Sequence, residues 1–267
     1  MKGQNERVVT KLETTFHEKV WGSRHLAPWF PDSEHKIGEV WFQAPAEVPL
    51  LVKFLFTTEN LSVQVHPEDE YARRHHGGSN GKTEMWRILR ADPGAKIALG
   101  LARDTTAVEL RSASLSGAIM DLLHWIEVKP GETYYTPART IHAIGEGVAL
   151  CEIQQISDIT YRLFDYGRPR ELHLDHGVAV SDLTRYRPAN LSSCPYFQTV
   201  EIEASRRHEI ESPADHSILI VIDGAGKFGT GESYRLGEAW HMASSTVTVH
   251  PETPSRFLLT WVPTRYI

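Results

Sequence analysis

The sequence predicts a mainly β protein, built as a sandwich or a barrel. Short apolar runs with period-two alternation recur along most of its 267 residues, and this alternation is typical of half-buried strands. Glycine and proline separate the runs, as in Asp92-Pro93-Gly94 and Lys129-Pro130-Gly131. No regular alternation of strand and helix patterns is visible, which disfavours a parallel α/β sheet.

Eight segments carry the strand pattern, and two carry a helical one. We expect strands at 51–56, 61–66, 86–89, 96–101, 125–128, 148–153, 217–222 and 256–262. A helix is expected over 105–124, because Thr105 and Thr106 are good caps and apolar residues recur later at helical spacing. A short helix is expected over 68–74, where Pro67 suits a first turn. The run at 217–222 is apolar on both faces, which predicts burial on both.

Composition excludes several classes of protein. The chain is 41% apolar and 23% charged, with a net charge of −6 and a pI near 6.2, so we expect a globular protein with no nucleic-acid or membrane partner. No apolar run approaches the roughly 20 residues of a membrane helix, and the first residues lack a secretory pattern. Cys151 and Cys194 cannot build a disulfide framework, so we expect a cytoplasmic location.

The strand at 61–66 combines an aliphatic face with a chemically rich one. Ser62, Gln64 and His66 share the second face, since alternate side chains of a strand point the same way. Such a face is either a solvent-facing edge or the interior of a barrel that holds a ligand or a metal. With Glu84 and His142, Gln64 and His66 form a candidate N/O ligand set that suits zinc and could also take iron, cobalt or manganese.

The residues around these ligands resemble the type I mannose-6-phosphate isomerases, zinc enzymes of the cupin superfamily. The resemblance covers about 160 residues, from Phe16 to His176, and the chain is similar to the short bacterial form without a helical insertion domain. The matching strings are KVWGSRHL (19–26), LSVQVHPEDEYA (61–72), GKTEMW (81–86), VKPGETYYTPARTIHAIGEG (128–147) and EIQQISDITYRLFDYGRPRELH (152–173).

The resemblance implies a fold, a cofactor and an arrangement of the chain. It implies two tandem cupin-type barrels, of the double-stranded β-helix or jelly-roll kind, with a few short helices. Residues 1–176 would form the catalytic metal-binding domain, and residues 177–267 a degenerate cupin-like β domain without metal. One Zn²⁺ per chain would be held by the zinc ligands of the family, which match Gln64, His66, Glu84 and His142.

The implied reaction interconverts mannose 6-phosphate and fructose 6-phosphate through an enediol. The catalytic positions match Arg162, Glu152 and Lys82, and the phosphate contacts match Ser62 and Arg168. The identity of the base stays open between Glu152, Lys82 and a metal-bound water. The partner would be a small-molecule sugar phosphate, and nothing in the sequence sets the oligomeric state.

One departure from the resemblance bears on the substrate. The loop before the last ligand reads Pro-Ala-Arg-Thr, with Arg139 where the family has glycine. This side chain could narrow the pocket, add a phosphate contact, or point to solvent without affecting the substrate, and the three alternatives stay open. Other functions remain open: a different sugar-phosphate isomerase, a cupin dioxygenase with iron in the same cage, and a non-catalytic sugar-phosphate sensor. The cations Lys82, Arg162 and Arg168 favour a phosphorylated substrate and so disfavour the dioxygenase. The complete ligand set disfavours the sensor.

Overall fold

The first part of the chain forms two antiparallel sheets that face each other. The computed structural model describes residues 9–188, 194–243 and 245–263. A six-stranded sheet has the order β2 (Thr14–Ser23), β3 (Ile37–Phe42), β4 (Leu50–Phe56), β11 (Val148–Gln155), β6 (Glu84–Ala91) and β9 (Thr133–Thr136). A five-stranded sheet has the order β12 (Tyr161–Phe164), β5 (Val63–Val65), β10 (His142–Ile144), β7 (Lys96–Leu101) and β8 (Leu123–Glu127).

The second part of the chain forms another pair of sheets, which borrows one strand from the first part. A five-stranded sheet has the order β1 (Val9–Lys11), β18 (Ala239–Ala243), β15 (His216–Asp223), β20 (Ser255–Trp261) and β13 (Gln198–Ala204). A four-stranded sheet has the order β14 (His208–Glu211), β19 (Thr246–Pro251), β16 (Ala225–Phe228) and β17 (Ser233–Arg235). Because Val9 pairs with Met242, the amino-terminal segment ties the two parts together.

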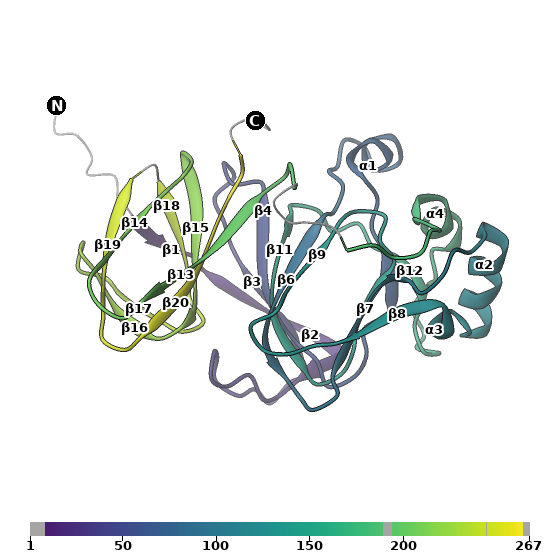
Figure 1. Ribbon diagram of the computed structural model, residues 1–267, viewed down its shortest axis with the longest axis horizontal. Coiled ribbons are helices and arrows are strands. Elements are labelled where there is room, and N and C mark those ends of the chain that lie inside the picture. The colour runs from purple at the N-terminus through teal and green to yellow at the C-terminus, as the bar shows by residue number, and fades with distance from the viewer. Residues whose placement is uncertain (1–8, 189–193, 244, 264–267) are drawn as a thin grey trace.

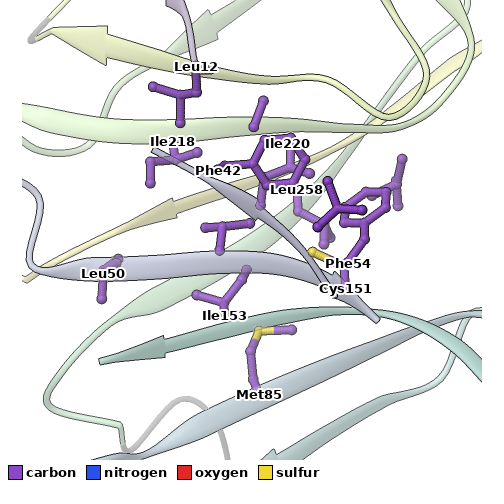
Figure 2. Packing of buried hydrophobic residues seen from close by; sticks show 14 of the residues in the cluster. Leu12, Phe42, Leu50, Phe54, Met85, Cys151, Ile153, Ile218, Ile220 and Leu258 are labelled. Atoms are coloured by element: carbon purple, nitrogen blue, oxygen red, sulfur yellow. The ribbon is translucent and has the colours of Figure 1, made fainter. Parts of the chain in front are cut away.

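The apolar residues divide into layers that follow the alternation of the strands. In β4, Val52 and Phe54 point out of the first pair of sheets, while Leu55 points between them and packs with Trp86 and Ile97. The outer face of the six-stranded sheet packs on Ile218, Ile220 and Leu258 of the second pair, as Figure 2 shows. Strand β15 is therefore buried on both faces, as its sequence predicts, since Leu219 and Val221 face the interior of the second pair.

The helices lie mostly on the far side of the five-stranded sheet of the first part (Figure 1). There α2 (Ala107–Ser116), α3 (Ile119–Leu122) and α4 (Leu174–Val180) cover Val63, Val65 and Leu163. Helix α1 (Asp69–His75) is the short helix expected after Pro67. No helix within the described ranges is long and apolar enough to cross a membrane.

The expected helix over 105–124 is correct only in its first half. It begins as predicted, because the Thr106 hydroxyl accepts a hydrogen bond from the backbone N–H of Glu109 at 3.1 Å. It ends at Gly117, whose φ of 84° is left-handed and terminates a helix. A four-residue helix follows, and Leu123 already begins β8.

The expected strands are found, with shifts of at most two residues at their ends. At 61–66 the regular strand β5 covers only Val63–Val65, and at 86–89 the strand β6 is longer, Glu84–Ala91. The predicted division of the chain at 176/177 falls inside α4, which packs on β12 of the first part. The assignment of domains to 1–176 and 177–267 therefore stays a prediction, and α4 belongs structurally with the first pair of sheets.

Candidate active site

Three buried side chains meet between the two sheets of the first part. Glu84 is the first residue of β6, His142 is the first residue of β10, and His66 directly follows β5. One donor atom from each lies within 4.8 Å of the other two, and each residue is 1% exposed. The register explains the meeting, because β5 and β10 are neighbours in one sheet while β6 lies in the sheet opposite. These three residues could hold a metal ion.

Backbone carbonyls fix the orientation of both imidazoles. Nδ1 of His66 lies 2.8 Å from the carbonyl oxygen of Ile159, and Nδ1 of His142 lies 2.8 Å from that of Thr140. A carbonyl can only accept, so each Nδ1 carries the proton and donates it. The neutral rings therefore direct the lone pairs of their Nε2 atoms toward Glu84. This is the tautomer that a metal ligand needs, and a carbonyl in this position is the usual support for one.

One atom at the centre of this group lacks the partner that a buried polar atom normally has. Nε2 of His66 is fully buried and takes part in no hydrogen bond, and Oε1 of Glu84 has no hydrogen bond but lies 3.1 Å from the ammonium nitrogen of Lys82. An unsatisfied buried polar atom costs about 1–3 kcal/mol. A divalent metal between them would satisfy both, and a mixed set of imidazole nitrogen and carboxylate oxygen suits one. The residues present therefore fit a metal ion.

Gln64 lies between this group and the neighbouring cavity. It pairs with His142 across β5 and β10, and its Nε2 is 3.3 Å from Nε2 of His142. Turning the amide by half a rotation exchanges its nitrogen and oxygen in the same space. Gln64 can then present Oε1 to a metal, so all four predicted ligands lie together.

The charges around the group hold the ligands in the protonation states that metals bind. Burial, aided by the nearby cation of Lys82, lowers the pKa of His66 to about 3, and burial also lowers the pKa of His142. Burial acts in the opposite sense on Glu84, but Lys82, with its Nζ 3.1 Å away, and His66 together hold the pKa of that carboxyl well below its usual range. At neutral pH the group offers neutral imidazoles and a carboxylate, ready for a cation.

A polar cavity of about 320 Å³ adjoins the candidate metal-ligand group, which consists of Gln64, His66, Glu84 and His142. It is large enough for a small metabolite. Five residues that the sequence singles out line it: Ser62, Gln64, Lys82, Glu152 and Arg162. The structure thus places the predicted catalytic residues around one cavity, beside the predicted ligands.

Glu152 is held by partners on both neighbouring strands. In the six-stranded sheet it pairs with Trp86 on one side and Lys53 on the other. Nε1 of Trp86 donates to Oε2 of Glu152 at 3.1 Å, and Nζ of Lys53 lies 3.3 Å from Oε1. Burial and the charge of Glu84 raise the pKa of Glu152, against the lowering effect of Lys53 and Lys82. It is a fully buried carboxyl whose affinity for a proton is increased.

Arg162 approaches the cavity from the opposite sheet. It lies on β12 and pairs with Gln64 across the strands. Its Nη1 donates to the carbonyl oxygen of Glu171 at 2.9 Å, while its Nε is buried without a hydrogen bond and 4.0 Å from Oδ2 of Asp165. The guanidinium is therefore positioned by the backbone carbonyl of Glu171 and lines the cavity.

The predicted phosphate contact Arg168 lies elsewhere, and Arg170 lines the cavity. The guanidinium of Arg168 donates to the carbonyl oxygen of Asn60 at 2.9 Å and to the carboxylates of Asp165 and Glu59 at 3.2 and 3.0 Å. Arg170 also binds Asp165, through Nε at 2.6 Å and Nη2 at 2.7 Å. The structure thus gives Arg168 three protein partners away from the cavity, and its role in substrate binding stays a prediction.

Arg139 is not among the residues that line this cavity, which agrees with the alternative that its side chain points to solvent. Its Nε donates to the carbonyl oxygen of Val180 at 3.2 Å, and its side chain lines a separate cavity. Its φ of 75° is left-handed, a conformation that glycine adopts without strain. The loop turns the side chain at position 139 away from the candidate metal ligands, although His142 lies only three residues later.

Sequence reasoning missed several charged residues of the cavity. Lys53 and Glu39 lie on β4 and β3, and Lys19 lies on β2; all three line the cavity together with Asp158, Thr160 and Arg170. Lys53 carried the clearest signal, because it is the one charged residue in the apolar run LLVKFLF. A buried lysine needs an anionic partner. Here the partners are Glu152 and Glu39, whose carboxylate oxygens are 3.3 and 3.9 Å from its Nζ.

Comparison with known proteins gives the family of the chain. No family model matches it. Mannose-6-phosphate isomerase ManA of Bacillus subtilis is 37% identical over 69% of this chain and 64% of its own length. The mannose-6-phosphate isomerase of Streptococcus mutans is also 37% identical, over 73% of this chain and 67% of its own length. The chain belongs to the type I mannose-6-phosphate isomerase family.

A solved structure confirms the fold expected of such an isomerase. The crystal structure of the mannose 6-phosphate isomerase from Bacillus subtilis superposes with a TM-score of 0.86 and 26% identity, over 95% of this chain and 99% of the other. The expected mainly β, cupin-type fold is confirmed. The sequence matches, in contrast, span just under two thirds of the length of the first relative and about two thirds of the second.

Proposed function

We propose that this member of the family is a zinc-dependent aldose–ketose isomerase that interconverts mannose 6-phosphate and fructose 6-phosphate through an enediol. One observation carries the proposal. Two imidazoles with fixed tautomers and one carboxylate converge at a point that adjoins a polar cavity. The cavity also contains a buried carboxyl and an arginine, the groups that a proton transfer next to a carbonyl requires. The names of its relatives support the same reaction.

Gln64, His66, Glu84 and His142 would hold one zinc ion per chain. The chemistry that zinc supplies when bound is polarisation of the carbonyl oxygen of the sugar. Both His Nε2 atoms already present lone pairs to the site, so binding needs no change of tautomer. The support from Ile159 and Thr140 keeps these rings oriented when substrate enters.

Glu152 is our choice for the base that moves the proton between the first two carbons of the sugar. Its carboxyl is fixed by Trp86 and Lys53, so it can meet a bound substrate in one orientation. Its raised pKa brings its proton affinity closer to that required for both accepting and returning a proton. The other candidate bases are Lys82 and a metal-bound water, and Lys82 is the less suitable because it keeps its proton. Burial opposes its charge, but Glu84 and Glu152 outweigh burial and raise the pKa of Lys82, so it stays an ammonium group.

Arg162 would stabilise the negative charge that develops on the enediol oxygens. A guanidinium is always charged and is fixed here by the carbonyl of Glu171, so it acts without reorganisation. For the phosphate, the cavity offers the Ser62 hydroxyl and the cations Lys19 and Arg170. We propose Arg170 as the principal guanidinium contact, because Arg168 is held outside the cavity lining.

The free cysteines fit a reducing compartment. Cys151 and Cys194 are both free and buried, and burial raises the pKa of the Cys151 thiol, which makes it inert. We therefore propose that the reaction takes place in the cytoplasm, where thiols stay reduced.

A single assay tests the proposal. The purified protein is given fructose 6-phosphate in a coupled assay that distinguishes mannose 6-phosphate from glucose 6-phosphate, and its metal content is measured on the same sample. We expect mannose 6-phosphate as product and about one zinc per chain. Glucose 6-phosphate as the sole product would indicate a different isomerase. Oxygen consumption with iron in the site would indicate a dioxygenase, and substrate binding without turnover would indicate a sensor.

A further inference from the structure

A second cavity, separate from the candidate active site, has three arginines in its wall. It measures about 350 Å³ and lies between the loop Pro137–Thr140 and the segment that follows α4. Arg139 comes from the loop, and Arg185 and Arg187 come from the segment. The two stretches are joined by the backbone, because the amide of Asp182 donates to the carbonyl oxygen of Arg139 at 2.9 Å.

The three guanidinium groups have no anionic partner in the described ranges. Arg139 makes one side-chain bond, to a neutral carbonyl, and among the described residues the carboxylate of Asp104 binds the backbone amide of Arg185, at 2.6 Å, rather than its guanidinium. Elsewhere on the surface of the same part, Arg103 pairs with Glu109 and Arg111 with Asp175. Three like charges around one cavity repel each other, so the arrangement favours an anion as occupant.

The acidic residue in the same wall does not neutralise them. Oδ1 of Asp182 accepts hydrogen bonds from the backbone N–H of Thr184 at 2.9 Å and from its hydroxyl at 2.8 Å. This carboxylate is committed to stabilising the turn that presents Arg185 and Arg187. With three cations and one anion, the wall carries a net positive charge.

The backbone of Arg139 gives an independent indication. Its φ of 75° is a left-handed conformation that strains a residue with a side chain. The conformation is imposed, because its amide donates to the carbonyl oxygen of His66 at 2.8 Å and its carbonyl accepts from Asp182. Its side chain is exposed, so burial in a core does not explain an arginine there. Strained backbone positions cluster at active sites and ligand clamps, so this position is consistent with a ligand in the cavity that its side chain lines.

We propose that this cavity is an anion site that binds a phosphoryl group, either as inorganic phosphate or as part of a phosphorylated sugar. Guanidinium groups match phosphate oxygens through paired N–H donors, which is why arginine dominates such sites. The cavity exceeds what a bare phosphate ion fills, so a phosphorylated small molecule is the occupant that uses it best. The site stands whether or not the neighbouring cavity is an isomerase centre, because the two share no lining residue.

The test follows the backbone amides of the full, metal-loaded chain by NMR during titration with inorganic phosphate, fructose 6-phosphate and unphosphorylated fructose. We expect saturable shifts at Asp182, Thr184 and Tyr186 with both phosphates and none with fructose. Signals of Ser62 and Gln64 report binding in the other cavity separately. Tighter binding of fructose 6-phosphate than of phosphate identifies a sugar phosphate as the ligand, and equal binding identifies free phosphate.

The double variant Arg185→Gln, Arg187→Gln removes two cations and no catalytic group. It should weaken binding at this cavity by about tenfold or more, since two charged hydrogen-bond donors are lost. The matched control is Arg206→Gln, Arg207→Gln, which removes the same charge from an exposed loop before β14 and should bind as the unaltered chain does. The spectrum itself shows that each variant is folded. Absence of saturable shifts in the unaltered chain, or equal affinity in the double variant and its control, overturns the proposal.

Discussion

Nε2 of His66 lies 3.2 Å from Oε1 of Glu84, and both atoms are buried without a hydrogen bond. Nε2 of His66 carries no proton, because the proton of the neutral ring is on Nδ1, which donates to the carbonyl oxygen of Ile159. A lone pair therefore faces a carboxylate oxygen in the interior of the protein. Two acceptors in contact are unfavourable unless a cation lies between them. The ammonium of Lys82, 3.1 Å from the same oxygen, compensates the charge of Glu84 but supplies nothing to the lone pair of His66, and this relationship is the physical basis of the proposed metal site.

The first prediction concerns the metal. His142→Ala should lose bound metal and activity, because it removes one of the two lone pairs that face Glu84. The protein should stay folded, because the apolar layers on both sides of the sheets do not include this group. Metal analysis and circular dichroism measure the two effects. His208→Ala, an exposed residue of β14, is the control and should keep its metal. Retention of a full equivalent of metal by His142→Ala would show that the ligand set is different.

The second prediction concerns pH. If Glu152 is the base, activity requires its carboxylate and falls as pH decreases through its pKa, which burial and Glu84 raise above 4.5. Lys53 lowers that pKa, so Lys53→Met should move the acid limb of kcat/KM to higher pH. Lys19→Met removes a cation that contacts Glu39 instead, at 3.5 Å, and should move the limb less. An acid limb that does not move in Lys53→Met would exclude Glu152 as the group that controls it.

The raised pKa of Glu152 also determines how the stability of the protein changes with pH. The folded chain binds the Glu152 proton more tightly than the unfolded chain does, so this contribution to the free energy of unfolding is full below pH 4.5 and is lost as pH rises through the raised pKa. Glu152→Gln removes the dependence. Its thermal midpoint should therefore fall less than that of the unaltered protein between acidic and neutral pH. A parallel fall in both would contradict the raised pKa.

The third prediction concerns Arg162. Arg162→Ala should lower kcat and kcat/KM together by about 10²–10³-fold, or roughly 2.7–4 kcal/mol, as expected for a donor that acts on developing charge. Zinc content should not change, and Arg162→Lys should restore little, because an ammonium group lacks the planar fork. Steady-state kinetics and thermal unfolding are measured side by side. Normal turnover with a strongly reduced thermal midpoint would make the residue structural.

The fourth prediction separates two neighbouring arginines. Arg170→Ala should raise KM for the sugar phosphate by about tenfold, the effect of losing charge-assisted hydrogen bonds, with a smaller change in kcat. Arg168→Ala should leave KM nearly unchanged and lower the thermal midpoint, because Arg168 joins Glu59, Asn60 and Asp165. The reverse pattern would assign the phosphate to Arg168, as the sequence resemblance implies.

The fifth prediction concerns the contact between the two parts of the chain. A chain that ends at residue 176 should aggregate and lose activity, because Phe42, Phe54 and their neighbours would lose the cover of Ile218 and Ile220 (Figure 2). A chain that ends at residue 188 keeps α4 and should aggregate as well, which shows that the apolar face rather than the helix is responsible. Light scattering and binding of an apolar dye measure the exposure. A soluble, monomeric and active short chain would disprove the interpretation.

Local patterns in the sequence contain most of the secondary structure. Strand β7 is found at Lys96–Leu101, the predicted range, because its alternation is bounded by turns on both sides. The helix over 105–124 was predicted too long, because Gly117 was not identified as its left-handed end. Period and capping act between neighbouring residues, and so the sequence shows them directly.

By itself, the sequence determined the mainly β fold and the buried strand β15, since both rest on alternation along strands. Motifs of a few residues singled out the candidate metal ligands, three of which the structure brings together. Only the tertiary structure decided which charged residues share a cavity. Lys53 and Glu152 are far apart in the sequence and meet because β4 and β11 are paired in register. The structure also placed Arg170 in the cavity and turned Arg139 away from it, because the direction of a side chain in a loop depends on backbone bonds to distant strands, here to His66.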